Sequence, residues 1–245
     1  MRGRIFYTAG NTAALTCAAQ RLESAGCAFT QVPCGEVTDL LLPVPSLDPG
    51  GTVKGGDNLQ DILKLLPDGI TVYGGNLPEL PGCRVWDLLK DPAYVAENAY
   101  ITAHCAVRLA MEKLPIALRG CKILVIGWGR IGKCLAALLK GLEADVTVAA
   151  RKESDRAILA ALGYGAIPTE NLSGNEYRVI FNTVPLMILT NAPTGCLCID
   201  LASIPGIEGN TVIHARGLPG KDAPEASGEL IARTVLRLLN KGEFF

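Results

Sequence analysis

The sequence predicts an α/β protein with parallel sheets, and three observations lead to this class. Short apolar segments rich in β-branched residues alternate with helical segments along the chain. The 245 residues, 49% of them hydrophobic, are enough for two lobes with cores of their own. A G-x-G-x-x-G run, residues 127–132, lies between an apolar strand and a helix. We therefore expect two Rossmann-like lobes, of which the second is a dinucleotide-binding domain.

The N-terminal lobe is expected over residues 1–96, where strands and helices alternate. Asp57 is the expected cap of one helix, and Pro67 is expected to end it. The stretch 43–56 is rich in Pro and Gly, which is typical of a loop. The expected strands are 4–8, 39–44, 70–73 and 84–88, and the expected helices are 12–24 and 57–66.

The second lobe is expected over residues 97–222. Its first helix, 97–114, has alanines and other apolar residues on one stripe at helical spacing, and we expect it to bridge the lobes. A terminal helix, 223–239, is expected to cross back, so that 223–245 packs on the first lobe. The other expected elements are strands 122–126, 145–149, 178–182, 196–201 and 211–215 and helices 131–142 and 154–162.

The glycine-rich run has the spacing of a pyrophosphate-binding turn. Gly127 allows the tight turn, Gly129 lets the backbone approach a pyrophosphate, and Gly132 lets the helix pack closely on the strand. The free N–H groups at the start of the helix then face the phosphates. The residues expected to contact the cofactor here are Gly127, Trp128, Gly129, Arg130, Ile131 and Gly132.

The end of the next strand bears on the choice of cofactor. NAD enzymes usually carry an acid there that binds the ribose 2′-hydroxyl, but this chain has Ala150 followed by Arg151 and Lys152. A guanidinium can hold a 2′-phosphate with two hydrogen bonds. We therefore expect NADP, with NAD as the alternative cofactor. The competing interpretation is that the two cations are a solvated surface pair.

Polar residues follow two later strands, at the sheet edge where open α/β sheets bind ligands. Asn182, Thr183, Val184 and Pro185 are expected to contact the cofactor, although the same residues are typical of an ordinary turn. In the next loop, Asp200 is either a functional acceptor or a capping residue. The candidate catalytic residues are His104, Asn182, Asp200 and Ser203.

Further polar residues are candidates for binding a substrate. Asn98 and Thr102 lie with His104 on the predicted bridging helix, and all three are expected to face Asn182, Thr183 and Ser203 across a pocket. A lone histidine such as His104 is more often structural than catalytic. Two cations near the last strand, Arg216 and Lys221, either bind substrate carboxylates or belong to a surface loop.

Composition excludes several other classes. The net charge of −1 without a basic cluster argues against nucleic acid, and no apolar run reaches the ~18 residues of a membrane span. The start lacks a signal-peptide pattern, which favours the cytoplasm. Nine cysteines without a C-x-x-C pair are expected to be buried thiols, and two histidines cannot form a histidine-rich metal site, so no metal is expected.

Six segments together resemble one known family. They are residues 97–103, 127–132, 149–152, 181–185, 200–206 and 217–224. These segments are similar to those of the A subunit of dipicolinate synthase, most strongly from about Glu97 to the end. The N-terminal lobe resembles the family less and is shorter. His104 stands where the family commonly has an acid, and it either replaces that acid in proton transfer or alters the chemistry.

The resemblance implies a two-lobed protein similar in plan to D-2-hydroxyacid dehydrogenases. It implies an NADP-dependent oxidoreductase subunit of sporulating bacteria that converts a hydroxy-tetrahydrodipicolinate to pyridine-2,6-dicarboxylate. The implied partners are this small dicarboxylate and a second subunit resembling flavin-binding proteins, and a homo-oligomer is expected. Two alternatives stay open. One is a D-2-hydroxyacid-type dehydrogenase with another small carboxylate substrate, although its usual Arg/Glu/His set is not evident. The other is a non-catalytic nucleotide-binding regulatory subunit.

Overall fold

The computed structural model describes residues 3–170, 172 and 175–242 of the chain. They form two compact units, each built around a parallel sheet. Unit 1 comprises Met1–Asn98 and Pro219–Phe245, and unit 2 comprises Ala99–Leu218. The predicted fold class, α/β with two Rossmann-like lobes, is confirmed.

Unit 2 holds a six-stranded sheet in the order β11-β10-β9-β6-β7-β8, with every strand pair parallel. Read from β8, this is the strand order of the doubly wound dinucleotide-binding fold. The chain reverses its direction of winding between β6 and β9, and ligands bind at such a switch point. The strands are β6 (Lys122–Ile126), β7 (Asp145–Ala149), β8 (Gly165–Ile167), β9 (Val179–Asn182), β10 (Leu197–Asp200) and β11 (Val212–His214).

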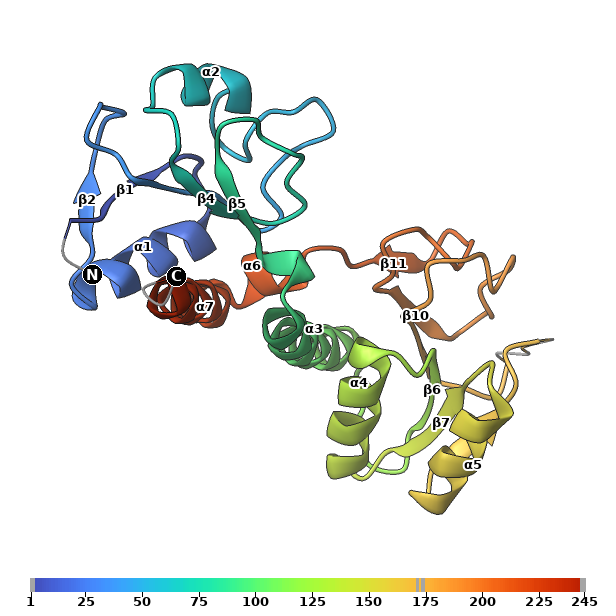
Figure 1. The fold of residues 1–245 in the computed structure, drawn as a ribbon. Coiled ribbons are helices and arrows are strands. Elements are labelled where there is room, and N and C mark those ends of the chain that lie inside the picture. Colours follow the sequence, from blue (N-terminus) through green and yellow to red (C-terminus); the bar gives the residue numbers. More distant parts are fainter. Residues whose placement is uncertain (1–2, 171, 173–174, 243–245) are drawn as a thin grey trace. The chain divides into compact units, whose positions relative to one another are not determined.

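Two amphipathic helices connect the strands on one side of the switch point. Helix α4 (Arg130–Gly141) packs on β6 and β7, and α5 (Glu153–Ala161) packs on β7 and β8 (Figure 1). The buried face of α4 includes Leu135 and Leu139, which are fully buried. Fully buried β-branched and leucine residues run along β6, as expected for a strand covered on both faces.

Unit 1 holds a five-stranded parallel sheet in the order β2-β1-β3-β4-β5. This is the other common doubly wound order, that of the flavodoxin-like fold. The strands are β1 (Ile5–Thr8), β2 (Ala28–Thr30), β3 (Asp39–Leu41), β4 (Thr71–Gly74) and β5 (Arg84–Asp87). The helices among them are α1 (Ala13–Ser24), α2 (Leu59–Lys64) and the 3-10 helix η1 (Leu88–Lys90).

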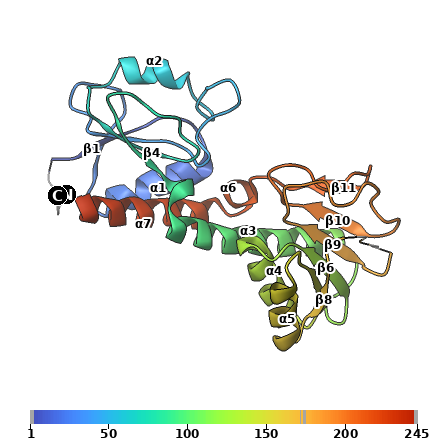
Figure 2. The ribbon, with the colours of Figure 1, turned by 45° about the vertical axis from the view of Figure 1, so that its right-hand side comes forward.

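The C-terminal helix α7 (Pro224–Gly242) lies alongside α1 within unit 1, as Figures 1 and 2 show. The two helices approach closely at Gly228, where an added Cβ would lie 2.5 Å from the Cβ of Cys17. Unit 1 is therefore completed by a segment that follows unit 2 in the sequence. The short helix α6 (Leu218–Asp222) precedes α7.

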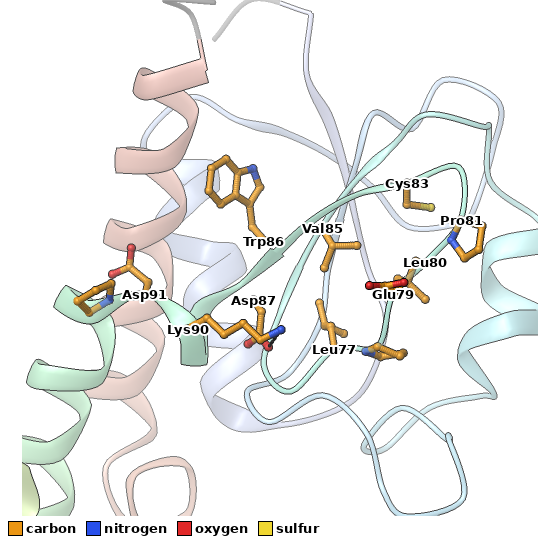
Figure 3. Close-up of a pocket in the computed structure, with 12 residues that line it drawn as sticks. Leu77, Glu79, Leu80, Pro81, Cys83, Val85, Trp86, Asp87, Lys90 and Asp91 are labelled. Carbon is orange, nitrogen blue, oxygen red and sulfur yellow. Dashed lines mark ion pairs between the residues drawn. The ribbon is translucent and has the colours of Figure 1, made fainter.

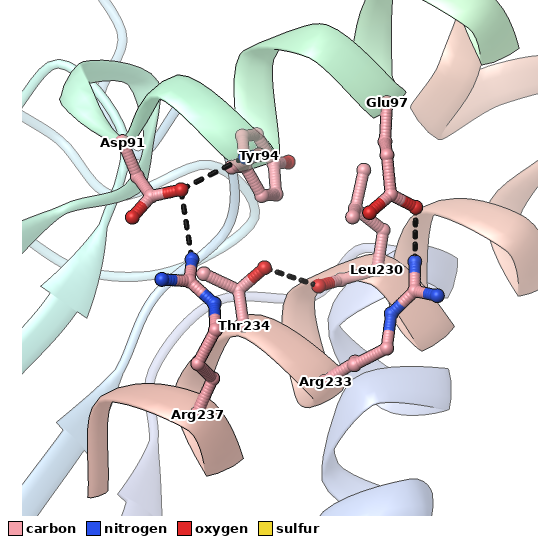
Figure 4. A network of polar contacts seen from close by, with 7 residues as sticks. All are labelled: Asp91, Tyr94, Glu97, Leu230, Arg233, Thr234 and Arg237. Carbon is pink, nitrogen blue, oxygen red and sulfur yellow. Dashed lines mark hydrogen bonds and ion pairs between the residues drawn. The ribbon is translucent and has the colours of Figure 1, made fainter. Parts of the chain in front are cut away.

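Within unit 1, polar contacts join α7 to the start of α3 (Pro92–Lys113) and to Asp91, which directly precedes it (Figure 4). Arg237 donates a hydrogen bond to the carboxylate of Asp91 at 2.8 Å, and Arg233 forms an ion pair with Glu97. Burial alone would raise the pKa of Asp91, but the hydrogen bonds from Arg237 and from the N–H of Tyr94 hold it below its ordinary value.

Several predicted boundaries were wrong for local reasons. Helix α2 is capped by Asn58, whose side chain accepts a hydrogen bond from the N–H of Gln60, rather than by Asp57. Helix α3 starts at Pro92 rather than at residue 97, since proline suits the first helical turn. Two edge strands of three residues, β2 and β8, and the short helix α6 were not predicted.

Within the described residues, no cysteine forms a disulfide. Five of the nine cysteines are buried, as expected, whereas Cys17, Cys34, Cys83 and Cys134 are only partly buried. None of the helices in the described ranges is both long enough and apolar enough to span a membrane.

Candidate functional site

The glycine-rich turn joins β6 to α4 at the switch point of unit 2. Gly127 has a φ of 104°, and an added Cβ would lie 2.5 Å from the hydroxyl oxygen of Thr183. A Cβ on Gly132 would collide with the carbonyl oxygen of Gly127, so the helix and the turn pack backbone to backbone. A Cβ on Gly129 would meet no atom within 4 Å. Two glycines thus shape the turn, and the third leaves open space beside it.

The N-terminus of α4 is available to a ligand. Its cap is Gly129, which makes no side-chain hydrogen bond to the first turn. The first N–H groups of a helix have no partner within the helix, and they carry the positive end of its dipole. An anionic group beside Gly129 would receive these hydrogen bonds. The turn therefore fits the pyrophosphate of a dinucleotide.

A cavity of about 300 Å³ lies beside this turn, wholly within unit 2. It contains six of the predicted cofactor-binding residues, which come from three separate loops. Four further residues were not predicted: three lie on loops whose course the sequence does not reveal, and the fourth lies in the first turn of α5. The predicted residues are Gly127, Trp128, Ala150, Arg151, Lys152 and Val184, and the additional ones are Asp155, Thr169, Leu186 and Ile188.

The cations of the cavity are held on a fixed turn. Arg156, on α5, donates hydrogen bonds of 2.8 Å to the carbonyl oxygens of Ala150 and Arg151. Ala150 is buried, whereas Arg151 and Lys152 are exposed. Within the described ranges, neither side chain takes part in an ion pair or hydrogen bond. Both cations are thus free to bind an anionic ligand.

Trp128 forms one wall of the cavity and is itself held by neighbours. Its ring meets that of Tyr164 edge-on, with centroids 6.1 Å apart. The ammonium of Lys133 lies 5.7 Å from the centroid of the indole, which is a cation–π distance. The indole therefore offers a fixed apolar surface next to the open space at Gly129.

Asn182 and Asp200 lie at the ends of neighbouring strands, where the sequence placed catalytic candidates. Both side chains are buried, and the amide of Asn182 donates to the carboxylate of Asp200 at 2.9 Å. The carboxylate also accepts hydrogen bonds from the N–H groups of Ala202, Gly206 and Ile207.

The rest of the Asn182 side chain is also engaged. Its amide donates to the carbonyl of Val184, and its carbonyl accepts from the N–H of the same residue, both at 3.0 Å. Every polar atom of Asn182 and Asp200 therefore has a partner. In this arrangement both residues shape the loops after β9 and β10, and their catalytic role stays a prediction.

The other candidates near these strands differ in exposure. The Thr183 hydroxyl donates to the carbonyl of Ile126 at 2.9 Å, whereas Pro185 and Ser203 are exposed. Arg216 donates to the carbonyl of Ala202 at 3.3 Å and stays exposed. Lys221 is exposed as well and belongs to unit 1.

The three candidates on α3 do not share one face of the helix. Thr102 is buried and His104 is exposed, because residues two positions apart point to different sides of a helix. Asn98 lies on the same side as Thr102, four positions earlier, and is partly buried. His104 therefore lies on a different side of α3 from the other two, and the pocket that all three were expected to face stays a prediction. Their roles in substrate binding and catalysis stay predictions.

A larger cavity, of about 690 Å³, lies in unit 1 beside β5 (Figure 3). Its lining is largely apolar and includes Trp86. Three acids line it too: Asp87 lies 3.8 Å from the ammonium of Lys90 and Asp91 is bound by Arg237, whereas Glu79 has no ion pair or hydrogen bond within the described residues. The smaller cavity of unit 2 is the better candidate site because it lies at the glycine turn and, in the described part of the chain, both of its cations are unpaired, whereas Lys90 of the larger cavity is paired.

In the part of the chain that the structure describes, no three His, Cys, Asp or Glu side chains gather as metal ligands would.

Comparisons with known proteins agree with this geometry. No protein-family model matches the chain. The A subunit of dipicolinate synthase from Bacillus subtilis (strain 168) is 25% identical over 241 residues, which cover 87% of this chain and 81% of that protein. The crystal structure of the A subunit of dipicolinate synthase from Bacillus halodurans has a TM-score of 0.83 at 21% identity, covering 97% of this chain and 98% of that one.

The fold is also similar to that of a solved dehydrogenase. D-lactate dehydrogenase from Escherichia coli has a TM-score of 0.58 at 16% identity, covering 98% of this chain and 97% of that one. The resemblance to the A subunit of dipicolinate synthase that the sequence motifs indicated is confirmed.

Proposed function

We propose, from the resemblance to the A subunit of dipicolinate synthase, that this chain is the NADP-binding oxidoreductase subunit of such an enzyme. Its substrate is a hydroxy-tetrahydrodipicolinate, its product is pyridine-2,6-dicarboxylate, and it works in the cytoplasm of a sporulating bacterium. A flavoprotein-like second subunit is its partner, and the chain forms a homo-oligomer. Unit 2, the predicted NADP-binding Rossmann domain, binds the cofactor.

One observation carries the proposal. Two unpaired cations and the first residues of the glycine turn line one cavity at the switch point of unit 2, and the turn continues through the open space at Gly129 to the N-terminus of α4. Each feature matches one part of NADP: the backbone N–H groups match the pyrophosphate, and the guanidinium of Arg151 matches the 2′-phosphate. Apolar side chains such as Ile188 match the adenine ring. NAD is the alternative cofactor.

The proposed reaction removes one water molecule and two hydrogens from the substrate ring. Loss of the hydroxyl group with a neighbouring proton gives a dihydropyridine dicarboxylate. A hydride then leaves with its electron pair, a proton goes to solvent, and the ring becomes aromatic. Bound NADP supplies the hydride acceptor. The protein has to orient the ring and to neutralise two carboxylates.

The candidate residues divide into two groups by their geometry. Asn182 and Asp200 have no free polar atom, so we assign them to positioning the loops that flank the cofactor. Ser203 and His104 are exposed and are the candidates for proton transfer. Asn98, Thr102, Arg216 and Lys221 are the candidates for binding the substrate carboxylates.

The test is an ultraviolet assay for the aromatic product. The purified chain is mixed with the hydroxy-tetrahydrodipicolinate and NADP, with and without the second subunit. We expect equal amounts of NADPH and pyridine-2,6-dicarboxylate, measured at 340 nm and by chromatography. Binding of NADP without turnover in either mixture would favour a regulatory role. Oxidation of a simple 2-hydroxyacid instead would favour the D-2-hydroxyacid-type dehydrogenase.

A further inference from the structure

We propose that Asp155 sets how strongly the cofactor pocket discriminates NADP from NAD, by opposing the two cations beside it. This inference rests on the proposed function, because it concerns the same cavity. Asp155 lies in the first turn of α5 and lines the cavity with Arg151 and Lys152. The usual sequence criterion for NAD or NADP examines the residue at the end of β7, which is Ala150 here. It therefore does not consider Asp155.

Asp155 is partly buried, and its carboxylate is unpaired within the described residues. In the described ranges of the chain, it takes part in no ion pair or hydrogen bond. It therefore differs from Asp200, whose oxygens are saturated, and from Asp91, which Arg237 binds. The pocket thus combines two free cations with one free anion. A ligand placed among them interacts with all three charges.

The three charges act differently on the two cofactors. A 2′-phosphate is attracted by Arg151 and Lys152 and repelled by Asp155, whereas a 2′-hydroxyl can donate a hydrogen bond to a carboxylate. Removing the charge of Asp155 should therefore favour NADP and remove an acceptor useful to NAD. The hydrogen bonds from Arg156 fix the turn that carries Arg151, so the opposed charges keep their places in the pocket.

The experiment compares two adenosine fragments, adenosine 2′,5′-bisphosphate and 5′-AMP, by calorimetry on the full chain. The ratio of their dissociation constants isolates the 2′-phosphate. Asp155→Asn should tighten binding of the bisphosphate by about three- to tenfold and should not tighten binding of 5′-AMP. The gain should shrink in 0.5 M salt, which screens the charges. Asp155→Ser serves as a second neutral variant.

Glu153→Gln is the matched control. Glu153 lies in the same first turn of α5, is exposed, and is not among the residues that line the cavity. Its removal changes the net charge equally, and we expect less than about a twofold change in either constant. Equal effects of Asp155→Asn and Glu153→Gln would overturn the inference, as would equal shifts for both fragments. If the unmodified chain bound neither fragment nor NADP, the proposed function itself would fail.

Discussion

Gly129 differs from the other two glycines of its turn, because a side chain added to it meets open space rather than protein. We predict that Gly129→Val abolishes NADP binding and leaves the free energy of unfolding of unit 2 nearly unchanged. The branched side chain would occupy the space that the pyrophosphate needs. Calorimetry gives the affinity, and circular dichroism checks the fold.

Gly141→Val is the control for this variant, since Gly141 is also surrounded by open space but lies at the far end of α4. It should bind NADP like the unmodified protein. A folded Gly129→Val variant with unchanged affinity would refute the assignment of the turn.

Gly132 is expected to behave in the opposite way. Its missing Cβ allows the backbone of α4 to lie against the carbonyl oxygen of Gly127. Gly132→Ala should destabilise unit 2 by about 1–3 kcal/mol, because the helix and turn must move apart. Urea unfolding measures this, with Trp128 as the fluorescent reporter in a Trp86→Phe background, since the two tryptophans lie in different units. Unchanged stability would show that the packing at this contact is loose.

At the scale of elements, Asp200 ties the loop after β10 to the end of β9. Asp200→Ala would leave three buried N–H groups and the amide of Asn182 without their acceptor. We predict a loss of about 3 kcal/mol or more in the free energy of unfolding of unit 2. Glu208→Ala, at an exposed position of the same loop region, should cost less than about 0.5 kcal/mol. Equal losses of unfolding free energy in the two variants would show that Asp200 does not stabilise the loop after β10.

The contact between α3 and α7 is expected to depend on pH. The pKa of Asp91 is lowered in the folded chain, so its contribution to stability is present above its unfolded pKa of about 3.9. That contribution is lost as the pH falls through the lower, folded value. At pH 7, Asp91→Asn should reduce the free energy of unfolding of unit 1 by about 1–2 kcal/mol, and the difference should vanish near pH 2–3.

Fluorescence of Trp86 in a Trp128→Phe background reports the unfolding of unit 1. Asp61→Asn is the control, because the Asp61–Lys64 pair is exposed on both sides and should contribute little. If the difference between Asp91→Asn and the unmodified chain were constant over the whole pH range, Arg237 would not be the cause of the lowered pKa.

The elements with strong local patterns could be predicted from the sequence. Strand β6 is a continuous apolar run, and α4 follows a glycine turn, so both were found within a residue or two. Edge strands β2 and β8 have three residues each and pair on one side only, which leaves too short a pattern to recognise. The cap of α2 was missed because Asp57 and Asn58 are both good capping residues and only the backbone decides between them.

At the scale of the whole molecule, the sequence predicted the cofactor-binding turn but not the full wall of its cavity. Residues 127–132 form one continuous motif, whereas Thr169 and Leu186 reach the same cavity from separate loops and Asp155 reaches it from the first turn of α5. The hydrogen bonds to the carboxylate of Asp200 could not be predicted either, because their donors lie beside Asp200 only once the loop after β10 has folded. Helical periodicity alone places His104 and Thr102 on different sides of the helix.

The preference for NADP over NAD tests the central claim most directly. The measurement compares the calorimetric dissociation constants of both cofactors for the unmodified chain and for the Ala150→Asp, Arg151→Ala double variant. We predict that the unmodified chain binds NADP about ten- to a hundredfold more tightly, as a charge-assisted contact of about 1.5–3 kcal/mol implies. The double variant should reverse the order. Equal constants in the unmodified chain, or binding of neither cofactor, would contradict the account.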